Sequence, residues 1–101
     1  MGIIYTTAER EYAAYDERCE QRKKTLYIAT MNFVNYFVSL GDDTTVAKSK
    51  VAQVSTEVNA ALYGYILGNT QPLIDGINAS TLSFMDAAAK SKLVEDLTVS
   101  V

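Results

Sequence analysis

The stretch from Thr6 to Leu40 contains no glycine or proline, and apolar side chains recur along it at alternating spacings of four and three. Such spacing places side chains on one face of an α-helix, as at the a and d positions of a heptad. Thr6 and Glu9 match a capping box at its start, and Gly41 can end it. The pattern predicts one helix from about Thr7 to Leu40. The positions of this seam, of which only Arg22 is not apolar, are Ala8, Tyr12, Tyr15, Cys19, Arg22, Leu26, Ala29, Phe33, Tyr36 and Leu40.

The predicted helix changes character near its middle. Residues 9–24 carry ten of the 21 charged residues of the chain, and the apolar stripe there is narrow. A narrow stripe on a charged helix suits contact with one other helix, whereas a wide stripe suits the core of a bundle. From Thr25 onward the stripe widens through off-seam residues, which are Tyr27, Ile28, Met31, Val34, Phe37 and Val38.

The remainder of the chain has shorter helical patterns separated by turn residues. A second helix is predicted from about Thr45 to Leu67, after a turn that Asp43 or Thr44 can cap. A third follows from Pro72 to about Ala79, and a last one from about Thr81 to Leu97, capped by Ser80 or Ser83. The fold class predicted is therefore all-α, a small helical bundle with one long N-terminal helix, a second long helix and one or two shorter C-terminal helices. Residues 1–101 form a single domain in this interpretation, with short apolar arms at both termini.

Two residue types that carry much protein chemistry are almost missing. The 101 residues include no histidine and one cysteine, Cys19. Without histidine the commonest general base and metal ligand are lost, and one thiol cannot hold zinc or an iron–sulfur cluster. Carboxylate chemistry, for instance Glu11 with Glu57, stays open. We expect no enzyme activity, no catalytic residues, no cofactor and no metal.

Charge and hydropathy argue against two further classes of function. The net charge is −3, whereas nucleic-acid binders are usually basic because they neutralise phosphates; we read Arg22, Lys23 and Lys24 as a solvated face and expect no nucleic-acid partner. The uncharged stretch from Thr25 to Leu40 is shorter than the roughly 20 apolar residues of a membrane span. The N-terminus does not resemble a signal peptide. The expected location is intracellular (cytoplasmic) or within a virion.

The lengths of the first two helices do not match. A helix of this length spans roughly 50 Å, and the second helix covers about two-thirds of it. The N-terminal seam would then need cover from the last helix or from another chain. We predict an interface there, formed by Tyr12, Tyr15, Cys19, Arg22 and Leu26. A reactive thiol is the alternative interpretation for Cys19, although a buried cysteine is more common.

These features favour a chain that acts by association. The leading hypothesis is a non-enzymatic structural or adaptor subunit of a larger protein assembly, with a virion component (a phage head or neck protein) as the first setting. The alternative is a small regulatory helical protein, such as an inhibitor or antitoxin-like dimer acting on a protein partner. In either case the partners are other protein chains, as a homo-oligomer or a multi-protein assembly.

Overall fold

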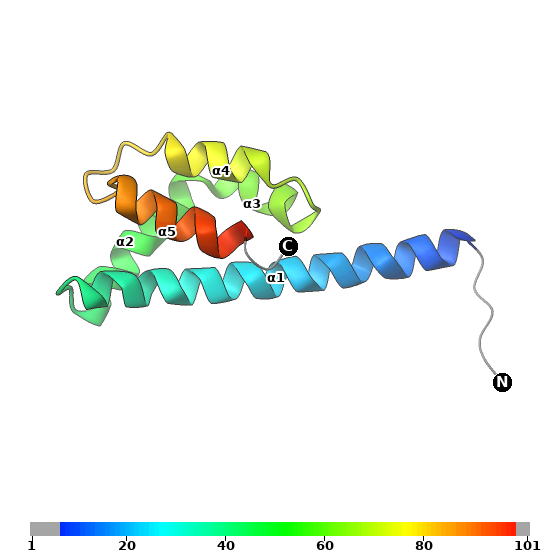
Figure 1. Ribbon diagram of the computed structural model, residues 1–101, viewed down its shortest axis with the longest axis horizontal. Helices are drawn as coiled ribbons and strands as arrows, with labels where there is room; N and C mark the ends of the chain where they lie inside the picture. The colour runs from blue at the N-terminus through cyan, green and yellow to red at the C-terminus, as the bar shows by residue number, and fades with distance from the viewer. Residues whose placement is uncertain (1–6, 99–101) are drawn as a thin grey trace.

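The computed structural model describes the backbone of residues 7–98 and the side chains of residues 14–98. This part of the chain forms five α-helices and no strand, so the all-α prediction is confirmed. Helices α2 to α5 all lie on one side of α1, and α1 runs along their base (Figure 1). The helices are α1 (Thr7–Ser39), α2 (Thr44–Glu57), α3 (Asn59–Ile66), α4 (Gln71–Asn78) and α5 (Ala87–Thr98).

The core forms between the seam of α1 and helices α2, α3 and α5, and α4 packs onto α3 and α5. Ala29, Phe33 and Phe37 are almost completely buried, as the periodicity of the sequence predicts for the first two. Each of the other four helices contributes buried residues to the same apolar cluster. Those buried most fully are Ala47, Val54, Tyr65, Leu73, Ile77, Ala89 and Leu97.

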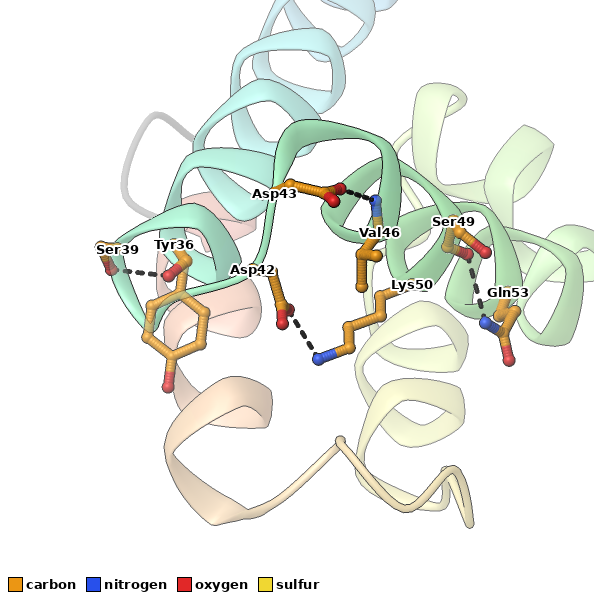
Figure 2. Close-up of polar contacts among 8 residues, drawn as sticks. All are labelled: Tyr36, Ser39, Asp42, Asp43, Val46, Ser49, Lys50 and Gln53. Atoms are coloured by element: carbon orange, nitrogen blue, oxygen red, sulfur yellow. Dashed lines mark hydrogen bonds and ion pairs between the residues drawn. The ribbon is translucent and has the colours of Figure 1, made fainter.

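The turn between α1 and α2 is held by two aspartates with different tasks (Figure 2). Gly41 adopts φ 111°, a region that favours glycine. Asp43 caps α2, because its Oδ1 accepts a hydrogen bond from the Val46 N–H at 2.8 Å. Asp42 pairs with Lys50 at 2.6 Å, and the Lys50 ammonium lies 5.1 Å from the centre of the Phe37 ring. Both carboxylates thus stabilise the turn.

The second predicted helix, Thr45 to Leu67, is divided in the structure. Val58 leaves helical geometry at φ −102°, ψ 11°, and it ends α2 and precedes α3. Thr56, Val58 and Asn59 all have modest helix propensity, and Val58 is buried directly beneath Gly76 of α4. The break therefore coincides with packing of Val58 against Gly76 of α4, a contact that periodicity along the chain does not reveal.

Gly64 and Gly76 give opposite expectations for an added methyl group. A Cβ on Gly64 would meet nothing closer than 3.9 Å, whereas one on Gly76 would lie 3.3 Å from Val58 Cγ1. We expect Gly64→Ala to raise the free energy of unfolding by about 0.5–1 kcal/mol through helix propensity. For Gly76→Ala we expect a free energy of unfolding about 1 kcal/mol lower than for Gly64→Ala, because the stiff, buried Val58 must move to accommodate the added methyl group. Urea denaturation checks the pair; equal gains would show that α4 and Val58 are not tightly packed.

The last helix begins later than predicted. It starts at Ala87, and its cap is Asp86, whose Oδ1 accepts a hydrogen bond from the Ala89 N–H at 2.9 Å. The predicted cap Ser80 is instead buried in the preceding segment. Met85 is buried and Leu82 and Phe84 pack against the core from this non-helical segment, so residues 81–86 were wrongly assigned to the helix.

The predicted apolar arms fall mainly outside the described residues. Residues 1–6, with the expected cap Thr6, and residues 99–101 lie outside the described residues. Thr98, at the start of the predicted C-terminal arm, belongs to α5. Among the helices within residues 7–98, none combines the length and the apolar character that crossing a membrane requires.

Candidate interaction surfaces on the long helix

Helix α1 extends well beyond the helices that pack on it (Figure 1). It has 33 residues, and the molecule measures 57 × 25 × 19 Å with a radius of gyration of 16.4 Å. A compact chain of this length would have a radius of gyration of about 13 Å. We call residues 7–18 the N-terminal overhang. Its described side chains, residues 14–18, are all exposed, so the length mismatch predicted from the sequence is present in the structure.

The predicted interface residues divide at Cys19. The backbone of Tyr12 lies in α1 within the overhang, but its side chain is outside the described residues. Tyr15 remains 41% exposed although it lies on the seam. Cys19 is only 9% exposed and has a free thiol. Cys19 is therefore buried within the chain, and of the predicted interface residues only Tyr12 and Tyr15 lie in the overhang.

Arg22, which is the one charged residue of the seam, marks the end of the bundle. Its Nη1 donates a hydrogen bond to Thr70 Oγ1 at 2.6 Å, and its guanidinium carbon lies 4.7 Å from the centre of the Tyr65 ring. Thr70 immediately precedes α4 and Tyr65 belongs to α3. Arg22 thus joins three segments inside the chain. Leu26 follows one turn later and packs against the core, so both residues serve folding first.

Tyr65 gives a pH-dependent test of this junction. The side chain is fully buried and its hydroxyl donates a hydrogen bond to the Leu97 carbonyl at 2.7 Å. Burial raises the pKa of Tyr65, against the opposing effect of the Arg22 charge. Because the folded pKa lies above the unfolded value near 10, this contribution to stability is complete below pH 10. It is lost as the pH rises through the folded pKa.

We therefore expect Tyr65→Phe to lower the free energy of unfolding by about 1 kcal/mol at pH 7. The free energy of unfolding of this variant should also decrease less steeply at alkaline pH than that of the parent. Urea denaturation at pH 7 and near pH 11 measures both effects. Tyr63→Phe is the matched control, since Tyr63 is 71% exposed on the same helix. If the free energy of unfolding of Tyr65→Phe fell as steeply at alkaline pH as that of the parent, groups other than Tyr65 would be responsible for the fall.

A second surface lies on the opposite side of α1. The sequence pattern assigned the off-seam residues to a widened core stripe, but Tyr27, Ile28, Met31 and Val38 are exposed, at 67%, 55%, 48% and 40%. Of the six off-seam residues only Phe37 is buried, and Val34 is partly buried. The signal was available: the apolar positions 27, 31, 34 and 38 form a second, shorter set of four–three spacings. We call Tyr27, Ile28, Met31 and Val38 the outer stripe.

Several charged groups in the described part of the chain have intramolecular partners. Within the described residues, no group of three or more acidic, cysteine or histidine side chains could hold a metal ion. Lys23 pairs with Glu20 at 3.2 Å, and Arg22 and Lys50 have the intramolecular partners given above. A small apolar pocket in the described part of the chain has Leu26, Phe33, Val54, Leu73 and Leu93 among its lining residues. It is a packing gap in the core.

Comparisons with protein-family models, with curated proteins and with solved structures give no match for this chain.

Proposed function

We propose that this chain is a non-enzymatic structural or adaptor subunit that associates with other protein chains through the N-terminal overhang of α1. The observation that carries the proposal is the overhang itself. Residues 7–18 continue α1 for roughly 18 Å at 1.5 Å per residue, past the helices that cover the rest of it (Figure 1).

The composition of the overhang suits a helical partner. Most helical stability in proteins comes from packing of an amphipathic face, because short helices are marginal in water. The overhang has an apolar seam, with Tyr15 half exposed, and exposed Asp16, Glu17 and Arg18 beside it. A second helix could cover the seam while pairing with charges of both signs. Tyrosine, with an apolar ring and a polar hydroxyl, is enriched at such interfaces.

The sequence supports a role without catalysis, since it contains no histidine and one cysteine, which is buried. A virion component, such as a phage head or neck protein, is the setting that we propose first, because such assemblies are built from small chains that act by association. An inhibitor or antitoxin-like regulator is the alternative.

Native mass measurement of the chain purified from its own source, with identification of co-purifying proteins, separates these roles. The structural proposal predicts a ring or larger assembly with a mass many times 11.1 kDa. A plain dimer, or a one-to-one complex with a different protein, would favour the regulator. A monomer without any partner would contradict association.

A further inference from the structure

We draw no further inference here: the strongest candidate, the outer stripe on the exposed face of α1 (Tyr27, Ile28, Met31 and Val38), carries none because nothing in the described part of the chain shows what covers it.

Discussion

Phe33→Ala should lower the free energy of unfolding by about 3–5 kcal/mol. Phe33 is 1% exposed at the centre of the α1 seam, and its ring lies 4.8 Å from that of Phe37 and 6.1 Å from that of Tyr36, measured between centroids. Truncation removes buried apolar area and leaves a cavity that α2 and α4 can only partly fill. Small domains have only about 5–15 kcal/mol of total stability, so this one substitution removes a large share. Urea denaturation followed by circular dichroism measures the change.

Tyr63→Ala is the control for Phe33→Ala, since it shortens an aromatic residue that is 71% exposed. Its effect should stay within about 0.5 kcal/mol. Similar losses in the two variants would show that burial by the bundle does not determine the stability of this chain.

The sequence was sufficient to predict the long helix and part of its core. The four–three spacing, with Arg22 as its one exception, specified α1 to within a residue, and Ala29 and Phe33 lie in the core where the seam predicted them. The short helix α4 was also predicted to within a residue by Pro72. These features are local, because helix period and capping depend on neighbours within a few residues.

The features that the sequence did not predict depend on contacts between distant segments. The break at Val58 coincides with packing against Gly76, and the late start of α5 depends on Met85 reaching the core before the helix begins. The exposure of the off-seam face of α1 was not predicted either. Both faces have apolar residues at four–three spacing, and the positions of the other helices leave Met31 exposed while Phe33 is buried.

The overhang was anticipated from helix lengths, but the burial of part of the predicted interface was not. Cys19 and Leu26 were grouped with Tyr12 and Tyr15 because they share a seam. The structure buries Cys19 and packs Leu26 against the core. Arg22 was recognised only as an exception to the pattern, since its partners Tyr65 and Thr70 lie more than 40 residues away along the chain.

Replacement of Tyr12 and Tyr15 together by serine should weaken assembly far more than folding. Burial of each tyrosine ring in an interface contributes about 1–3 kcal/mol from apolar area. Loss of both should therefore lower an association constant by about two to four tenfold steps. Both positions precede Cys19, in the part of α1 that extends beyond the bundle. The midpoint of thermal unfolding, measured at a concentration where the parent is dissociated, should change little.

The most direct test combines mass and stability for three proteins: the parent, the double tyrosine variant and Phe33→Ala. Sedimentation equilibrium over a range of concentrations gives the mass of each protein, and thermal unfolding gives its stability. Where native mass measurement finds co-purified partners, these are added to the samples. The overhang proposal predicts that the tyrosine variant loses the assembly but keeps the unfolding midpoint of the dissociated parent, while Phe33→Ala loses stability. A tyrosine variant that keeps its assembly and unfolds as early as Phe33→Ala would show that the N-terminal half of α1 is ordinary core.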